Sequence, residues 1–598
     1  MMTNQDRCKP AAGRWTVAFV WTLAVMAVCT LGSGVFAQTV EQNRARILPG
    51  DRITALPGSI TEVTGLDATP LGVALAGIVL VSDSAAVRDG ANAKGIVIQS
   101  ENPNLTDPAL RQVLARFIGQ PLSQRLIGEV RDAITNHMRA RNRPLVAVII
   151  PPQEVTSGSV QLLVVPFTLG EKRVERVANG HESTSDAYVL QTVRAQPGEE
   201  IVSDKLLADI NWLNLNPFRS VEVLFQPGSI VGTTDMHLRL TDKRPLQVYA
   251  GYANSGTSAT GSGRVFAGFS TASAAFGDQQ FAYQVTAAPG TVYTDGREFD
   301  FTADSAYLAH SVGYFAPLPW RHKLTLRGDY TRSRADLVDP LVQDNATWQI
   351  GLDYAVPVLH ANPSLDMFGG FEFKQQQNEV FFDDVSIKAS TIDVVQGVLG
   401  VRGEVSTKGL RTGFDLKGVF SPGGLTANNT DTAFAAASGT PSDRAQYAYI
   451  LGKLTHSSAL PKDLALNLTF SGQLAAQSLP AMEQFAIGGM RGVRGYEAGE
   501  RSGDNGFLLQ AELRLPKFSL LQRAGVFDQT SPYAFADYGL VHAITGDKTH
   551  SLLGAGLGVD VNVSDHLQAQ LVWGHAFLAG ATTTAHSNRL HASMVASY

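Results

Sequence analysis

Cysteine is almost absent from this sequence of 598 residues. The only two are Cys8 and Cys29, and both lie in an N-terminal stretch, residues 1–37, that we expect to be removed. The remaining chain can then form no disulfide, offer no thiol nucleophile and bind no metal through cysteine. An exported protein of this kind must obtain its stability from other interactions.

The N-terminal stretch has the order of parts of a secretory signal peptide. Basic residues between positions 7 and 14 precede an uncharged and mostly apolar run from Trp15 to Leu31. Small residues then offer a cleavage site, which we place after Ala37. A retained membrane anchor is the alternative, and the small residues at the end of the run disfavour it.

Charged residues and long hydrophobic runs are also scarce. Asp, Glu, Lys and Arg make up 17% of the chain, where about 25% is usual for soluble domains. Yet no segment after the signal is apolar for the roughly 18 residues that a membrane helix needs. An integral β-barrel combines these properties, because apolar residues occupy every second position of its strands. Cleavage leaves 45 basic and 53 acidic residues, a net charge of −8, which argues against nucleic acid as a partner.

Motifs of catalytic and metal sites are missing as well. The 13 histidines show no metal-ligand spacing such as His-Glu-x-x-His, and no Gly-x-Ser-x-Gly elbow occurs. The stretch GAGLGVD (554–560) imitates a nucleotide-binding pattern but lacks the strand-to-helix context. Small residues inside a barrel wall explain it better. We therefore expect no enzyme activity, no cofactor and no metal.

Residues 75–245 predict two α+β units of about 80 residues each, in which a strand, two helices and two strands follow one another. We expect the helices to begin at N-caps formed by Asp107, Ser123 and the Ser-Asp pairs at 185 and 203. The predicted helices are 107–120, 123–142, 185–195 and 203–214, and the predicted strands are 75–83, 95–99, 143–153, 159–166, 172–179, 220–228 and 234–242.

These units resemble the two polypeptide-transport-associated (POTRA) domains of two-partner secretion transporters. The resemblance is carried by VIIPPQEVTSGSVQLLVV (148–165), NLNPFRSVEVLFQPG (214–228) and GTTDMHLRL (232–240). The family includes the secretion proteins for filamentous haemagglutinin and Serratia-type haemolysin. It implies domains that hold client chains, with an extended client added to an exposed sheet edge or groove. Rigid spacers without client contact are the alternative.

From Leu246 to Tyr598, apolar and polar residues alternate along many segments. In residues 322–330, 464–473 and 506–515 one face is apolar and the other polar, which predicts strands. Many such strands without a second core layer fit a barrel with lipid outside and water inside. A large soluble β-sandwich or propeller is the alternative.

Aromatic residues support the membrane interpretation. Trp573, Tyr538 and Tyr598 occupy positions suited to the girdles at the two membrane interfaces. The terminal Tyr598 also closes an alternating strand, which resembles the C-terminal signal of bacterial outer-membrane proteins. The resembled family implies 16 strands, and strands of roughly 10 residues fit comfortably into this length.

One aspartate in this region needs a partner. In SPYAFADYGL (531–540) the alternation places Asp537 on the face with Tyr533, Phe535 and Gly539. Asp537 cannot face lipid without a cost of several kcal/mol, so we expect it to point into the lumen, where Gly539 leaves space. The glycine-rich stretch IGGMRGVRGYEAGE (487–500) supplies Arg494, whose guanidinium can bind a carboxylate through two parallel hydrogen bonds.

These two stretches carry a second resemblance. MRGVRGYEAG resembles the VRG(F/Y) motif on the long sixth extracellular loop of the same superfamily, and FADYG resembles its partner motif, Phe-any-Asp-any-Gly. The resemblance implies that Arg494 meets Asp537 inside the barrel as a loop-barrel lock and not as a catalytic dyad. The surrounding motif residues are Val493, Gly495, Tyr496, Phe535 and Gly539. A solvated Arg494 and another cation beside Asp537 are the alternative.

The fold class expected for the chain is α+β periplasmic POTRA domains followed by an all-β transmembrane barrel of 16 antiparallel strands. The expected divisions are a signal peptide at 1–37, a leader or plug region at 38–74, POTRA domain 1 at 75–167, POTRA domain 2 at 168–245 and an outer-membrane barrel at 246–598. Residues 39–48 are the only short candidate for a plug helix.

The resemblance implies an outer-membrane transporter that exports a partner exoprotein, of adhesin or haemolysin type, from the periplasm to the cell surface. The partner would carry an N-terminal secretion domain, and the barrel would contact outer-membrane lipid after insertion by the barrel-assembly machinery. A factor that assembles other outer-membrane proteins shares the loop motifs but generally has more than two POTRA domains. A passive porin would have none.

Overall fold

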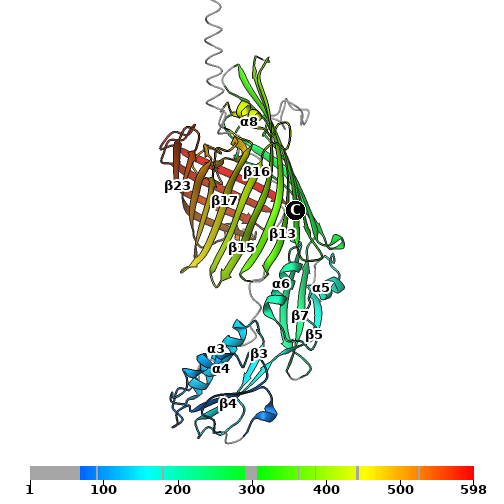
Figure 1. Cartoon of the computed structure of the whole chain (residues 1–598), viewed down its shortest axis with the longest axis vertical. Coiled ribbons are helices and arrows are strands. Elements are labelled where there is room, and N and C mark those ends of the chain that lie inside the picture. Colours follow the sequence, from blue (N-terminus) through cyan, green and yellow to red (C-terminus); the bar gives the residue numbers. More distant parts are fainter. Residues whose placement is uncertain are drawn as a thin grey trace, which may run out of the picture.

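Two small mixed sheets and one closed barrel follow one another along the chain (Figure 1). The computed structural model describes residues 67–598 apart from 89–91, 178–180, 231, 290–305, 338–339, 361, 384, 440–442 and 523–524. The predicted signal peptide, most of the predicted leader and the plug candidate at 39–48 lie outside the described residues. Among the described helices, none is both long and apolar enough to cross a membrane.

The first sheet has the strand order β2-β1-β4-β3. β1 is parallel to β2 and β4, and β3 is antiparallel to β4. The elements of this domain are β1 (Gly77–Val81), η1 (Ser84–Ala86), β2 (Gly95–Gln99), α3 (Pro108–Ala115), α4 (Gln124–Ala140), β3 (Val146–Ile149) and β4 (Ser159–Pro166). The predicted caps are confirmed, since the Asp107 side chain accepts the N–H of Ala109 and the Ser123 hydroxyl accepts that of Leu126.

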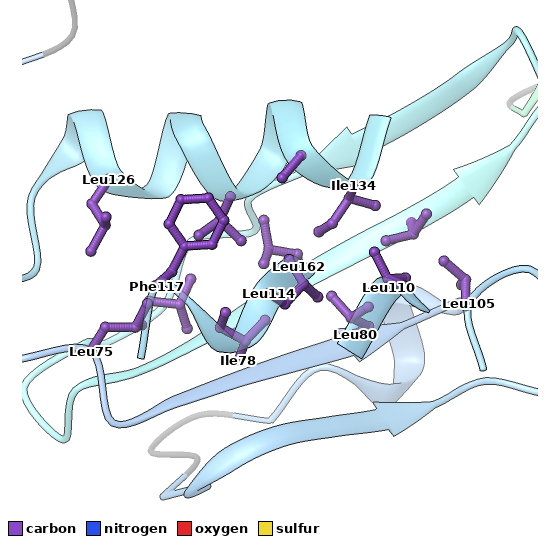
Figure 2. Close-up of a cluster of buried hydrophobic side chains, with 14 of the residues drawn as sticks. Leu75, Ile78, Leu80, Leu105, Leu110, Leu114, Phe117, Leu126, Ile134 and Leu162 are labelled. Atoms are coloured by element: carbon purple, nitrogen blue, oxygen red, sulfur yellow. The ribbon is translucent and has the colours of Figure 1, made fainter. Parts of the chain in front are cut away.

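The core of this domain lies between the two helices and the sheet (Figure 2). Leu114 of α3 and Ile134 of α4 are fully buried, as are Leu80 of β1 and Leu162 of β4. Each side chain of this size contributes about 1.5–3 kcal/mol when it leaves water. The domain therefore has a core of its own that does not depend on the barrel.

The second sheet repeats the arrangement of the first with one strand fewer. Its order is β5-β7-β6, with β5 parallel and β6 antiparallel to β7. The elements are β5 (Thr168–Arg176), α5 (Asp186–Thr192), α6 (Ser203–Leu213), β6 (Arg219–Pro227) and β7 (Thr233–Asp242). β5, β7 and β6 thus correspond to β1, β4 and β3, and β2 is an additional edge strand of the first domain.

One predicted cap is wrong. Ser185 caps α5 through the N–H of Tyr188, but Ser203 is the first residue of α6, whose N-cap Val202 makes no side-chain hydrogen bond. The Ser203 hydroxyl instead lies 3.2 Å from Oδ1 of Asn142, and its N–H donates to the Asn142 carbonyl. Serine at this position therefore joins the second domain to the end of α4, which sequence alone could not show.

The barrel is closed by 16 antiparallel strands, as predicted. Its last strand, β25, pairs with its first, β8, over five residue pairs. The wall strands are β8 (Leu246–Ala253), β9 (Arg264–Ser273), β10 (Gln279–Ala287), β11 (Tyr307–Pro317), β12 (Lys323–Asp336), β13 (Leu341–His360), β14 (Ser364–Phe382), β15 (Val385–Thr407), β16 (Leu410–Pro422), β17 (Gln446–Leu460), β18 (Leu464–Ala475), β21 (Asn505–Arg514), β22 (Asp528–Ala543), β23 (Lys548–Val563), β24 (Leu567–Ala576) and β25 (Asn588–Ser597).

The two faces of the wall differ as the alternation predicted. Large apolar side chains stand exposed on the outer face of successive strands, including Ile350, Phe371, Leu399, Phe420, Ile450, Phe470, Leu509, Leu557, Trp573 and Leu590. Polar side chains fill the inner face. Asp329, for example, accepts hydrogen bonds from Ser311 and Gln349. An apolar exterior around a polar interior is the arrangement that a bilayer requires.

Three neighbouring strands are about twice as long as the roughly 10 residues expected for a membrane strand. β13 has 20 residues, β14 has 19 and β15 has 23. Figure 1 shows these strands continuing past the rest of the wall, beside the helix α8 (Asp431–Ser438). Their outer parts are ribbons beyond the barrel, which the count of residues per strand did not reveal.

The second α+β domain is docked on the near end of the barrel, which we define as the end that faces the two α+β domains (Figure 1). Asp278, in the turn between β9 and β10, receives both terminal nitrogens of Arg219 at 3.0 and 2.6 Å. Asn216 and the Tyr188 hydroxyl donate to the same carboxylate. Burial, together with the Asp278 charge, raises the pKa of Tyr188 to about 12, so the hydroxyl remains a donor.

A second contact supports this docking. Arg321, in the turn between β11 and β12, lies 2.8 Å from Oδ1 of Asp209 and donates to the carbonyl of Thr192 at 3.0 Å. Its guanidinium also lies over the ring of Trp212, 5.7 Å from the ring centre. Two consecutive near-end turns therefore hold the domain in a fixed orientation.

We predict that Asp278→Asn loosens the second domain, because Arg219 is fully buried and an amide offers it no charge. Loss of a buried ion pair costs about 3–5 kcal/mol. Urea titration of the purified chain, followed by the helical circular dichroism signal, would show the lower midpoint. The matched control is Asp463→Asn, an exposed aspartate in the turn between β17 and β18. Equal midpoints for both variants would contradict the docking argument.

Candidate functional site

A loop folded into the lumen forms the most elaborate site of the barrel. This lumenal loop (residues 476–504) joins β18 to β21 at the far end of the barrel. It contains a turn η3 (Ala481–Glu483) and a hairpin of β19 (Phe485–Ile487) and β20 (Arg501–Gly503). Ile487, Val493 and Tyr496 are fully buried, although they belong to a connection between strands. The wall surrounds the loop, so its charges must be paired there.

Arg494 and Asp537 meet in this site. Nε of Arg494 lies 2.7 Å from Oδ2 of Asp537, and Nη2 lies 2.7 Å from Oδ1. The backbone N–H of Arg494 also donates to Oδ2 at 3.0 Å. The two side chains are only 4% and 0% exposed. Two parallel bonds from one guanidinium to one carboxylate are the geometry that arginine makes and lysine cannot.

A second carboxylate shares the guanidinium. Glu512 of β21 accepts a hydrogen bond from Nη1 of Arg494 at 2.5 Å, so one cation stands between two anions. The guanidinium also lies over the Phe535 ring, 3.8 Å from its centre. Arg494 therefore balances the charge of Glu512 as well as that of Asp537. Glu512 could have been found, because the alternation of residues 506–515 placed it on the polar face beside Arg514.

The predicted supporting residues surround this pair. Val493 packs against Gly539, where an added Cβ would come within 3.0 Å of the valine side chain. Gly495 has a φ of 101° and approaches the backbone of Gly574, a combination that only glycine adopts without strain. Tyr496 places its hydroxyl oxygen 3.0 and 2.8 Å from the carbonyls of Leu553 and Leu578.

Two wall glycines, Gly554 and Gly574, make room for the loop. An added Cβ at Gly554 would lie 2.0 Å from the Arg494 carbonyl, and one at Gly574 would lie 2.6 Å from the Gly495 nitrogen. At Gly556 an added Cβ would meet only wall atoms, the Trp573 carbonyl at 1.9 Å and the Phe535 ring at 2.9 Å. The stretch GAGLGVD lies within β23, where these small residues thin the wall beneath Arg494. Its glycines serve packing and not nucleotide binding.

The loop is also joined to two other far-end connections. Glu500 accepts hydrogen bonds from the backbone N–H groups of Thr582 and Thr583, between β24 and β25. Glu497 accepts a hydrogen bond from the N–H of Ser258, between β8 and β9. These bonds tie the loop to both sides of the seam where the barrel closes. Among the residues that the structure describes, no cluster of three or more His, Asp or Glu is arranged to hold a metal ion.

Comparison with known proteins identifies the architecture. Residues 232–561 match the family described as haemolysin secretion/activation protein ShlB/FhaC/HecB, and residues 93–166 match the POTRA domain of ShlB type. The first match spans more than half of the chain and includes Arg494 and Asp537. The chain belongs to the ShlB/FhaC/HecB family. The family named from the sequence motifs is therefore confirmed.

Individual relatives agree with this assignment. The heme/hemopexin transporter protein HuxB of Haemophilus influenzae is 25% identical over 439 residues, which cover 71% of this chain and 72% of that protein. The outer membrane transporter CdiB-2 of Burkholderia pseudomallei (strain 1026b) is 21% identical over 490 residues, covering 79% and 76%. The solved structure of CdiB from Escherichia coli has a TM-score of 0.65 at 17% identity, covering 91% of this chain and 94% of that one. CdiB from Acinetobacter baumannii has a TM-score of 0.58 at 16% identity, covering 99% and 100%.

Members of the ShlB/FhaC/HecB family are two-partner secretion transporters of the outer membrane. This chain is accordingly an outer-membrane transporter that exports a partner protein, with its POTRA domains in the periplasm. The near end of the barrel faces the periplasm, and the lumenal loop enters from the cell-surface end. The family match also favours export over the alternative of an assembly factor for other outer-membrane proteins.

We predict that Gly554→Ala unseats the lumenal loop, because the new methyl group would collide with the Arg494 carbonyl. Trypsin added to the purified chain should then cut after Arg494 about ten times faster than in the wild type, since cleavage reports local opening. Mass spectrometry would identify the cut. The matched control is Gly397→Ala in β15, where an added Cβ meets nothing within 4 Å. If both variants resist trypsin equally, Gly554 does not determine the position of the lumenal loop.

Proposed function

We propose that the lumenal loop is a lock whose Arg494–Asp537 pair holds the barrel in a secretion-competent shape while the partner chain is exported. The observation that carries this proposal is the burial of Arg494 on the loop and Asp537 on the wall. Their side chains are 4% and 0% exposed, and the two residues are 43 positions apart in sequence. A connection between strands has no need of such a pair for closing the barrel, because the strands already close through their own hydrogen bonds.

The chemistry of the pair is specific to arginine and aspartate. Lysine offers a single compact charge and cannot satisfy both oxygens of Asp537 and the Glu512 carboxylate from one position. Asparagine at 537 would remove the negative charge and place an amide N–H₂ against the donors of Arg494. Breaking a buried pair in this way costs about 3–5 kcal/mol, which is enough to change the population of the seated loop by orders of magnitude.

We further propose that the partner is a large exoprotein of adhesin or haemolysin type whose N-terminal secretion domain is captured in an extended form by the two POTRA domains. Each sheet ends in an edge strand, β3 in the first and β6 in the second. Apolar side chains stand exposed at these edges, at Ile149, Ile150 and Leu224. Backbone hydrogen bonds to such an edge would grip a client with little regard to its sequence.

The remaining steps need no chemistry from the protein. The captured chain enters the near end of the barrel and passes through the lumen, with the loop remaining in the channel or shifting within it. The client then folds outside, and its folding opposes backsliding. We propose no catalytic residue, nucleotide or metal for this process, and we propose that the chain is inserted into outer-membrane lipid by the barrel-assembly machinery.

We predict that Arg494→Lys and Asp537→Asn each reduce export at least about tenfold, since each replaces a buried bidentate pair by an unmatched group. The barrel should still reach the outer membrane, because its strand pairing does not involve either side chain. Secreted partner in the medium, divided by transporter in the outer membrane, is the measurement. Arg411→Lys is the control, since Arg411 makes an exposed pair with Glu404. Undiminished export in both variants would refute the lock.

Deletion of residues 170–245 should abolish client binding, because it removes the second POTRA sheet and the domain that docks on the barrel. Purified chain would be tested for capture of the N-terminal secretion domain of its partner, which we expect in a very long reading frame beside this gene. The control is the outer-membrane level of the truncated chain. A truncated chain that still captures the client would contradict the proposed role of this domain.

A further inference from the structure

A second buried charge holds the lumenal loop at its base. Glu483, in η3, has a side chain that is only 2% exposed. Its carboxylate lies 2.7 Å from Nζ of Lys374 and accepts the Tyr449 hydroxyl at 2.6 Å. Gln396 donates to the same carboxylate at 3.2 Å. The three partners come from β14, β17 and β15, so the wall of the barrel supplies every one of these contacts.

The wall side of this cluster is itself fixed. Lys374, whose side chain is 15% exposed, also lies 3.2 Å from Glu372 two residues earlier on β14. Gln396 donates to Glu372 at 2.7 Å and accepts the Tyr447 hydroxyl at 2.9 Å. One cation therefore stands between two carboxylates, with an amide bridging both anions. None of these residues belongs to the motifs that identified the loop.

The two charged clusters lie on different parts of the wall. Lys374 is on β14, and Asp537 is on β22, six strands further round the barrel. The loop contacts the part of the wall that contains β14 through Glu483. It contacts the part that contains β22 through Arg494, eleven residues later. The loop is thus held by two charged contacts to separate sectors of the wall, and β19 packs on β21 and β22 between them.

We propose that Lys374 and Glu483 form a base anchor that fixes the lumenal loop to the sector of β14 to β17, independently of the tip anchor formed by Arg494 and Asp537. This inference rests on the proposed function of the loop as an internal lock. Lys374 is a positioning residue in this scheme, because it acts on the exported chain only through the loop.

The two anchors have opposite polarity. At the tip, the loop supplies the cation and the wall supplies the carboxylates of Asp537 and Glu512. At the base, the wall supplies the cation and the loop supplies Glu483. A loop that slid or turned within the lumen would bring like charges together, which is unfavourable in both places. The sign pattern therefore specifies one direction and one register for the loop.

The base anchor also limits how far the loop can move when the tip anchor opens. When Arg494 leaves Asp537, the base remains tied to β14, β15 and β17, so this part of the loop stays in the channel. The lumen widens on the side of β22 to β24, where Gly554 and Gly574 thin the wall. Complete exit of the loop requires both anchors to open.

Thiol labelling can report the two anchors separately, because the described residues contain no cysteine. Leu479→Cys places a reporter near the base, and Val493→Cys places one at the tip. Both positions are buried, at 1% and 0% exposure. In purified chain, a maleimide should react with each reporter only when its end of the loop lifts.

We expect Lys374→Met to raise the labelling rate of the Leu479→Cys reporter at least about tenfold and to leave the Val493→Cys reporter within about twofold of the unmodified loop. Arg494→Lys should give the reverse pattern. The exchange Lys374→Glu with Glu483→Lys should restore protection of the base, since one cation again lies between two carboxylates. Lys388→Met is the control, because Lys388 on β15 donates to a carbonyl of α8 and not to this loop.

An unchanged rate at the Leu479→Cys reporter in Lys374→Met, or an exchange variant that labels as fast as the single variants, would overturn the base anchor. Glu483→Gln in the same reporter provides the test if Lys374→Met does not assemble into a folded barrel. Labelling is measured without the partner protein. Export that is insensitive to Arg494→Lys would therefore count against the proposed lock and leave the base anchor standing, so the two failures are distinguishable.

Discussion

The structure depends on one electrostatic constraint: a carboxylate that an inserted loop buries against the inner wall is shielded from water and must be met by a cation. Asp537 is fully buried on β22, and its ion pair is made with the lumenal loop and not with a neighbouring strand among the contacts of the described residues. The cation comes from a connection far along the chain, Arg494, which also satisfies Glu512. The Asp537 carboxylate would be unfavourable without a partner, and the ion pair that satisfies it also holds the loop inside the barrel.

Charge alone does not bring the loop close enough, and the wall is shaped to match. Gly554 and Gly574 let the backbone around Arg494 approach β23 and β24 to distances that any side chain would prevent. Gly539 accommodates Val493 in the same manner. These glycines cost the strands side-chain packing, and that cost is offset where the loop fills the space. Packing and charge consequently define the same position for the loop.

Much of this could be predicted from the sequence, because the informative signals were local. Alternation assigned Asp537 and Phe535 to the inner face, and two short motifs identified Arg494 as the partner. The contacts that escaped prediction join parts of the chain that fold separately: Glu483 of the loop with Lys374 of the wall, and Arg219 of the second domain with Asp278 of the barrel. Ser203 was misassigned as a cap for the same reason, since its hydroxyl lies beside Asn142 of the preceding domain.

The attachments of the barrel are distributed over separate sectors of its wall. The second POTRA domain is held by the turns of β9–β10 and β11–β12, whereas the loop is held by β14 to β17 and by β21 to β24. A movement of the loop tip away from β22 therefore does not have to disturb the turns that orient the domain. Because the docked domain and the loop share no residue contact in these two sets, the proposed capture of a client does not depend on the position of the loop. In the proposed mechanism, separate attachments thus let capture at the periplasmic end precede a change in the channel.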